Sequence, residues 1–388
     1  MGQDFDISNY LKAMREIWRT VGWDDRLGCH YERLTADRRP LLMGRRRGLV
    51  QARQLYCYAV AIEIGDDSDD RNMADALFEV LAGRYRADHG AWVFALDDDG
   101  AVVDAKIDFY LHAFLIFAFA HYHRATGAPA ALDFAWDILD RVLPRLAAPA
   151  GGWHTALDAD ARPMHGPLLQ NPHMHLLEAC LALNEVMPHA KVRDTVDTII
   201  SLFEDKLFDP KGGNLAEYFD NHWQRDRAQG QRLEPGHQVE WSWLLERVAS
   251  CFDKPQLTAI ADELFQFGLE HGQDLQRGGL YDEVDASGQV LVAGKRIWPQ
   301  TEFVKICARR YIRTGSAADQ QRLQTGMALL QQHYFCNDGS WREHLSADFN
   351  QQLVTDLPGS TPYHIQMGLL EVELSGGFSP ATQSGVIC

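Results

Sequence analysis

The chain of 388 residues is 46% hydrophobic and carries a net charge of −17, from 37 basic and 54 acidic side chains. This acidic balance disfavours nucleic acid or an anionic membrane surface as a partner, and the longest apolar run, Phe114 to Ala120, is far shorter than the roughly 20 residues of a transmembrane helix. Seven scattered cysteines without a CxxC pair, and an N-terminus without the basic start and apolar core of a signal peptide, predict a cytoplasmic protein with reduced thiols.

The first predicted element is a helix over residues 7–21, where apolar side chains recur at intervals of three and four. After this helix, a segment with the same sequence pattern occurs six times. Each copy opens on a glycine, continues as a short alternating strand and turns at a polar tip, which is typical of a β-hairpin. A fixed period of this length indicates a repeat architecture. The leading glycines are about 62, 61, 61, 66 and 61 residues apart: Gly28, Gly90, Gly151, Gly212, Gly278 and Gly339.

Helical patterns follow the hairpins. We predict first helices over 47–64, 109–126 and 171–186, second helices over 71–86 and 192–207, and a last helix over 363–374. One helix pair cannot bury both faces of its helices, so about twelve helices in six pairs must stack. An open solenoid is one outcome, but no segment has the polar character of a terminal cap and the last helix is apolar. The expected fold is therefore all-α, an (α/α)6 barrel with short β-hairpins at one face, formed by residues 1–388 as a single domain.

Polar residues recur at the start of the first helix of each pair. In a closed ring these helix starts face one central pocket, where helix N-termini favour negative charge. Imidazoles, an arginine and a carboxylate that converge there indicate proton transfer or anion stabilisation. Counting 22 to 25 residues from each leading glycine gives Arg53, His112, His175, His237, Glu302 and His364.

The stretch from Glu234 to Glu240 shows the pattern most clearly. A Pro-Gly break precedes a helix and places His237 and Glu240 on one face of its first turn, either as a cap or as a proton-transfer pair. His112 is equally compatible with a core histidine. His173 and His175 are two apart, so only one faces the pocket, and the repeat favours His175. Convergent histidines also leave zinc open, whereas a glycosidase would need two facing carboxylates.

The chain resembles the N-acylglucosamine 2-epimerase superfamily, most closely its D-mannose isomerase branch. This resemblance implies an (α/α)6 barrel, a free monosaccharide as substrate and no metal or cofactor. A histidine where His175 stands argues against an N-acetyl sugar, and Leu111 replaces the aspartate that the family usually has before its His-Ala-Phe segment. The segments that carry the resemblance are Gln51 to Tyr56, Tyr110 to Phe114, Asn171 to Glu178, Pro235 to Trp241, Trp298 to Glu302, and Tyr363 with His364.

The resemblance also implies roles for single residues. His237 and His364 correspond to the acid/base pair, His175 to the group that helps to open the pyranose ring, and Arg53 to the residue that holds the oxygen of the enediolate. Glu240 is expected to be the partner of His237 or a hydroxyl contact. The other residues expected to contact the substrate are Asn171, Tyr110, Trp298, Gln300 and Glu302.

The predicted activity is interconversion of D-mannose and related aldoses with D-fructose through a cis-enediolate. The same residues permit 2-epimerisation, and a sugar-binding module without catalysis is a third interpretation. We expect a monomer or a homodimer that binds neither nucleic acid nor membrane. The cluster from Arg45 to Arg47 keeps a phosphorylated sugar open.

Overall fold

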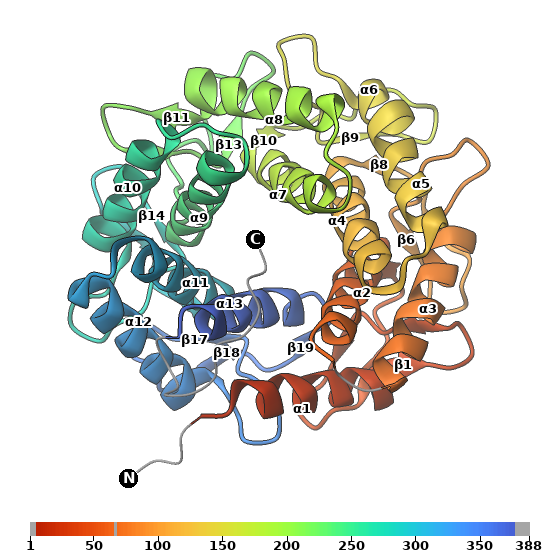
Figure 1. Cartoon of the computed structure of the whole chain (residues 1–388), viewed down its shortest axis with the longest axis horizontal. Coiled ribbons are helices and arrows are strands. Elements are labelled where there is room, and N and C mark those ends of the chain that lie inside the picture. Colours follow the sequence, from red (N-terminus) through yellow and green to blue (C-terminus); the bar gives the residue numbers. More distant parts are fainter. Residues whose placement is uncertain (1–4, 66–67, 377–388) are drawn as a thin grey trace.

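The computed structural model describes residues 5–65 and 68–376 and shows two concentric rings of helices (Figure 1). Helix α13 contacts both α2 and α1, so the last helix closes both rings onto the first ones. The inner ring consists of α2 (Gly48–Glu63), α4 (Phe109–Thr126), α7 (Gln170–Val186), α9 (Pro235–Cys251), α11 (Ile297–Thr314) and α13 (Pro362–Leu374). The outer ring consists of α1 (Ile7–Thr20), α3 (Ser68–Gly83), α5 (Pro129–Asp137), α8 (Ala190–Leu202), α10 (Leu257–Phe267) and α12 (Ala317–Leu329).

The sequence pattern explains which helices lie inside. In α2 every residue from Gly48 to Ala61 is buried, because this helix packs on all sides and its polar side chains face the axis. In α8 burial is confined to one face, as expected for an amphipathic helix against solvent. Four outer helices continue into a π-helical turn, and α5 then into α6 (Leu143–Leu146); these turns are Ile138–Val142, Phe203–Leu207, Gly268–Gly272 and Leu330–Tyr334.

Short strands connect each repeat to the next. The residue pair before an inner helix pairs with the hairpin of the following repeat, antiparallel in every case. The last of these pairings joins Leu357 to Leu34, more than 300 residues apart, and this closure excludes the open solenoid. The six pairings, each named by its first residue, are Arg46 with Leu96, Ile107 with Leu157, Leu168 with Phe219, Leu233 with Val284, Lys295 with Leu345 and Leu357 with Leu34.

The strands themselves are two or three residues long, and all lie on the side where the inner helices begin. They are β1 (Trp23–Asp24), β2 (Cys29–His30), β3 (Arg33–Leu34), β4 (Pro40–Leu41), β5 (Arg46–Arg47), β6 (Ala95–Leu96), β7 (Val102–Asp104), β8 (Ile107–Asp108), β9 (Ala156–Leu157), β10 (Leu168–Leu169), β11 (Phe208–Asp209), β12 (Asn214–Leu215), β13 (Tyr218–Phe219), β14 (Glu283–Val284), β15 (Val290–Val292), β16 (Lys295–Arg296), β17 (His344–Leu345), β18 (Gln352–Val354) and β19 (Leu357–Pro358).

The predicted barrel is thus confirmed, with most helix ends within three residues of the expected positions. The six cysteines that the structure describes are unpaired, and Cys388 lies outside the described residues. Within the described ranges, no helix combines the length and the apolar character needed to cross a bilayer.

Candidate active site

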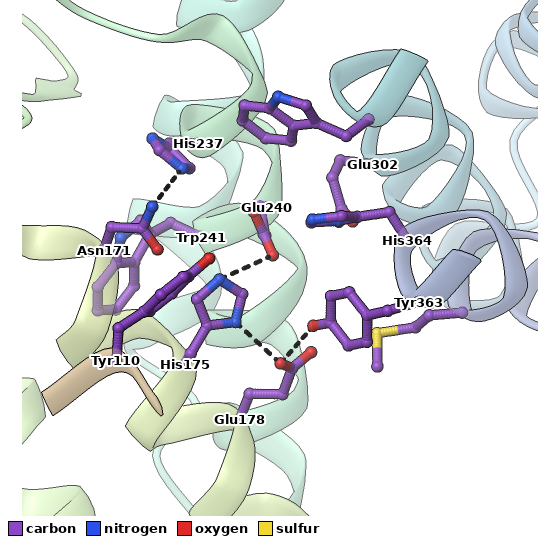
Figure 2. Close-up of polar contacts among 12 residues, drawn as sticks. Tyr110, Asn171, His175, Glu178, His237, Glu240, Trp241, Glu302, Tyr363 and His364 are labelled. Atoms are coloured by element: carbon purple, nitrogen blue, oxygen red, sulfur yellow. Dashed lines mark hydrogen bonds and ion pairs between the residues drawn. The ribbon is translucent and has the colours of Figure 1, made fainter. Parts of the chain in front are cut away.

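The pairing of strands between repeats gives a common register for the inner helices. Seven residues beyond the first paired residue of each repeat, every side chain is buried, and most are polar or charged. Figure 2 shows His175, Glu240, Glu302 and His364 facing a shared space from four helices. Burial of so many charged groups has a cost that a binding or catalytic site explains. The residues at this position are Arg53, Phe114, His175, Glu240, Glu302 and His364.

This register corrects the count from the leading glycines, which put His112 and His237 in the same class. His112 stands two residues earlier and has a structural contact. Its Nε2 accepts a hydrogen bond from the Trp92 backbone N–H at 3.1 Å, and its Nδ1 donates to the Asp108 carbonyl at 2.7 Å. His112 therefore fixes a hairpin on the helix and has no free nitrogen for the pocket.

The position of His112, five residues beyond the first paired residue of its repeat, is also structural in other repeats. His173 accepts from the Trp153 backbone at 3.1 Å and donates to the Leu169 carbonyl, as His112 does. Gln300 accepts from the backbone N–H of Leu280 at 2.7 Å and donates to its carbonyl at 3.0 Å. Gln300 was expected to contact the substrate, but its amide is used to hold the hairpin, as are those of Gln51 and Gln238.

His237 forms a dyad with a residue that the sequence did not indicate. Its Nδ1 lies 2.8 Å from Glu217 Oε2, and its Nε2 lies 3.2 Å from the Asn171 side-chain amide (Figure 2). Burial by itself would lower the pKa of His237, but the carboxylates of Glu217 and Glu234 outweigh it and raise this pKa to about 9. His237 is therefore an imidazolium at neutral pH. Glu240, expected to be its partner, is not hydrogen-bonded to it.

Glu217 is itself fixed by neutral donors. Its carboxylate accepts from Gln170 Nε2 at 2.7 Å and from the Glu234 backbone N–H at 3.2 Å. Gln170 in turn accepts from the Trp241 indole. Glu217 lies between β12 and β13, in a hairpin whose sequence carries no sign of a catalytic partner.

His364 forms the second dyad, with the opposite protonation. Its Nδ1 lies 2.8 Å from Glu302 Oε1, and Lys305 forms an ion pair with the other oxygen of Glu302. Burial lowers the pKa of His364 to about 3, against the hydrogen bond to Glu302. For Glu302, burial favours the neutral acid, but Lys305 and His364 outweigh it and lower the pKa to about 2. His364 is thus neutral, with its proton on Nδ1 and no hydrogen bond from Nε2 to any described residue.

His175 forms a third contact of this kind. Its Nδ1 lies 3.1 Å from Glu178 Oε2, which also accepts from the Tyr363 hydroxyl, and its Nε2 lies 3.9 Å from Glu240 Oε1 (Figure 2). Burial lowers the pKa of His175 to about 4. Burial and the nearby Glu302 raise the pKa of Glu240 well above its usual value, and neither of its oxygens has a hydrogen-bond partner among the described residues. Burial therefore favours the neutral acid form of Glu240, beside an imidazole whose neutral form is also favoured.

Arg53 is the cation at the mouth of this cluster. Its guanidinium donates to the Tyr110 hydroxyl at 2.7 Å and to the Ser360 carbonyl at 3.2 Å, and it lies 4.3 Å from the centre of the Phe114 ring. Within the described chain no carboxylate forms an ion pair with Arg53. A buried guanidinium held by rings and neutral oxygens keeps its charge available for an anionic substrate oxygen.

The Trp298 ring lies near the histidines of both dyads. Its ring centre is 4.9 Å from that of His237 and 5.5 Å from that of His364. Gly236 permits this position, because a Cβ there would lie 2.5 Å from the indole. The structure therefore brings together all the predicted site residues except Gln300.

Two groups of ligand atoms could hold a metal ion: Glu217, Glu234 and His237, and Glu240, Glu302 and His364. In each group the histidine Nδ1 is already hydrogen-bonded to a glutamate, and a carboxylate is ion-paired, to Arg296 in the first and to Lys305 in the second. Both groups are better described as histidine–glutamate dyads.

The basic cluster at Arg45 to Arg47 is not directed at the pocket. Arg46 is buried and forms ion pairs with Asp24 at 2.8 Å and Asp98 at 3.2 Å, and Arg47 is bound to Glu32. The charges of Arg46 and Arg47 are thus used within the fold, and Arg45 is exposed, which weakens the sequence argument for a phosphorylated substrate.

Comparison with known proteins decides the family. The family model of N-acylglucosamine 2-epimerase (GlcNAc 2-epimerase) matches residues 29–368. The chain belongs to this family. It is 33% identical over 395 residues to a mannose-6-phosphate isomerase of Rhizobium meliloti (strain 1021), with 96% of this chain and 98% of the relative covered. It is 24% identical to a cellobiose 2-epimerase of Bacteroides fragilis, with 92% and 95% covered.

Solved structures agree on the fold. A D-mannose isomerase superposes with a TM-score of 0.86 at 20% identity, covering 95% of this chain and 97% of the other. A cellobiose 2-epimerase from Bacillus thermoamylovorans B4167 superposes with a TM-score of 0.85, covering 95% and 98%. Family and relatives together make this protein an enzyme of the sugar isomerase and epimerase class.

Proposed function

We propose that this enzyme interconverts D-mannose and D-fructose by proton transfer through a cis-enediolate. The observation that supports this most is the pair of histidine–glutamate dyads whose rings both lie against Trp298; their surroundings raise the pKa of His237 and lower that of His364. The C2 proton of an aldose is weakly acidic, so its removal needs a base that is free at neutral pH and a group that stabilises the resulting oxyanion. His364 meets the first requirement and Arg53 the second.

The proposed reaction begins with opening of the sugar ring. His175 presents its Nε2 lone pair 3.9 Å from Glu240, which holds a proton. An adjacent base and acid can take the proton of the anomeric hydroxyl and protonate the ring oxygen, and this gives the open-chain aldehyde. Glu178, by accepting the Nδ1 proton, keeps the lone pair of His175 on Nε2.

The isomerisation follows at the two dyads. His364 Nε2 takes the proton from C2, the C2–H electron pair forms the C1–C2 double bond, and the negative charge develops on the carbonyl oxygen beside Arg53. The imidazolium of His237 then gives a proton to C1 while the C2 hydroxyl loses its proton to the imidazole that results, and the imidazolium of His364 protonates the oxyanion at C1. These transfers give the neutral ketose and restore both histidines to their starting states. Glu302 stabilises the imidazolium of His364 that forms in the first step.

A 2-epimerase is the second candidate, and the protonated state of His237 favours it. His237, a second proton-transfer group on another helix beside the same indole, can return a proton to the other face of C2. One experiment separates the outcomes: incubation with mannose in deuterium oxide, followed by NMR. Isomerase activity gives fructose labelled at C1, whereas glucose labelled at C2 as the main product would replace our proposal with the epimerase. A sugar-binding module would exchange no proton at all.

The substrate we propose is the unphosphorylated sugar. Arg46 and Arg47 are bound to carboxylates, and a phosphate beside His237 would meet the carboxylates of Glu217 and Glu234. The matched test is kcat/KM for mannose and for mannose 6-phosphate under identical conditions, which we expect to favour mannose. Full activity after exhaustive chelation would exclude the zinc interpretation. A cytoplasmic location and a monomer or homodimer remain predictions, the latter testable by light scattering.

A further inference from the structure

A buried lysine lies directly behind the candidate base. Lys305, on α11, has no exposed surface and forms an ion pair with Glu302. Its ammonium also lies 4.2 Å from the centre of the Trp243 ring and 3.5 Å from Met367 Sδ. In the common register Lys305 stands one helical turn beyond Glu302, farther from the helix start. A fully buried ammonium is expensive unless its charge has a task, and none of the proposed steps uses Lys305 directly.

Comparison of the two dyads shows what this charge changes. The geometry is the same in both, with 2.8 Å between histidine Nδ1 and the glutamate oxygen. Apart from His237 itself, the described residues give Glu217 only neutral donors, from Gln170 and the Glu234 backbone, and the carboxylate of Glu234 lies 3.9 Å from His237 Nδ1. The full negative charge of Glu217 therefore acts on His237. Glu302 is paired with a cation, so His364 faces a carboxylate and an ammonium that nearly cancel.

We propose that Lys305 determines which histidine is the base: by offsetting the charge of Glu302 it keeps His364 neutral, while His237, beside the uncompensated Glu217, holds the proton. Lys305 is thus a positioning residue for protons and does not touch the sugar. This inference rests on the proposed function, since it assigns the directions of the two proton transfers in the same site.

The other charged groups around His364 do not replace Lys305. Arg53 on α2 disfavours a proton on His364, as does His175 on α7 when it is protonated, and burial favours the neutral acid form of Glu240 on α9. Glu178 on α7 carries a negative charge and lies close enough to Lys305 to favour its ammonium form. Without Lys305 the negative charge of Glu178 and Glu302 would exceed the positive charge of the nearby cations. The cluster would then take up a proton.

Lys305→Met tests this, because methionine keeps the length of the side chain and removes the charge. Without Lys305 the full charge of Glu302 acts on His364. An opposite charge at hydrogen-bond distance shifts a pKa by about 1 to 3 units, so we expect the acidic limb of the pH profile of kcat/KM to move to higher pH by about that amount. In Lys305→Arg, which retains the charge, the limb should stay at its native position even where the overall rate falls. A folded Lys305→Met protein with an unmoved limb would overturn the proposal.

A titration of the native protein gives a second test that needs neither a variant at Lys305 nor a sugar. Histidine ring signals from ¹⁵N NMR are assigned by their loss in His364→Asn and His237→Asn. We expect His364 to remain neutral, protonated at Nδ1, from pH 5 to pH 8, and His237 to remain protonated over the same range. If both rings titrate together, Lys305 does not distinguish them. The proposed function fails separately, by the absence of fructose in the deuterium experiment.

Discussion

Replacing Glu217 with glutamine removes the charge 2.8 Å from His237 Nδ1 and preserves the size of the side chain. At an effective dielectric constant of about 20, unit charges about 3 to 4 Å apart interact by about 4 to 6 kcal/mol, which corresponds to about 3 to 4 pH units. Glu234, 3.9 Å away, retains part of the effect. We therefore expect the pKa of His237 to fall from about 9 to about 6.5 in Glu217→Gln.

The consequence is a loss of activity that depends on pH. At pH 8 the protonated fraction of His237 falls from about nine-tenths to about 3%, a decrease of about 30-fold, whereas at pH 6 the two proteins should differ by less than about twofold. The assay is kcat/KM for mannose from pH 5.5 to 9.5. Glu234→Gln is the matched control, with a smaller shift because Arg296 shares the charge of Glu234. An equal loss at every pH would refute the reasoning and give Glu217 a purely structural role.

Four further outcomes are expected. Because the pKa of His237 is raised from 6.5 to about 9 on folding, it contributes about 3 kcal/mol that is present below pH 6.5 and lost as the pH rises through 9; urea unfolding should show this term in the native protein and not in Glu217→Gln. His364→Asn should lower kcat by at least about 100-fold, and a near-native rate would exclude it as the base. Arg53→Lys should reduce kcat by about 100-fold with little change in KM; an effect on KM alone would indicate ground-state binding. His112→Gln should be tolerated, whereas His112→Ala should cost about 1 to 3 kcal/mol in thermal unfolding, since a buried backbone N–H loses its acceptor; equal stabilities would contradict a structural role.

The architecture was predictable because its causes are local. A repeat of about 61 residues, apolar residues around the whole of each inner helix, and one-sided patterns on outer helices are all written in short segments. Residues such as His175 and Glu302 were also found from sequence, since a helix start and the period fix their places.

Positions were predicted wrongly where the count of residues had to cross a loop of variable length. The glycine spacings range from about 61 to 66 residues, so a count that crosses a hairpin slips by one to three positions. On a helix each residue turns the side chain by about 100°, and a slip of two exchanges a pocket residue for a structural one. That is why His112 was grouped with His175. Gln300 was assigned to the substrate from the family resemblance, although its amide holds a hairpin.

By itself, then, the sequence determined the barrel, its repeat and the residue types near its centre. Only the tertiary structure decided their protonation, because this depends on neighbours from other repeats. Glu302 reaches His364 across 62 residues, and Glu217 reaches His237 from a hairpin. Both dyads pair a histidine with a glutamate, but burial lowers the pKa of His364, whereas the carboxylates of Glu217 and Glu234 outweigh burial and raise the pKa of His237.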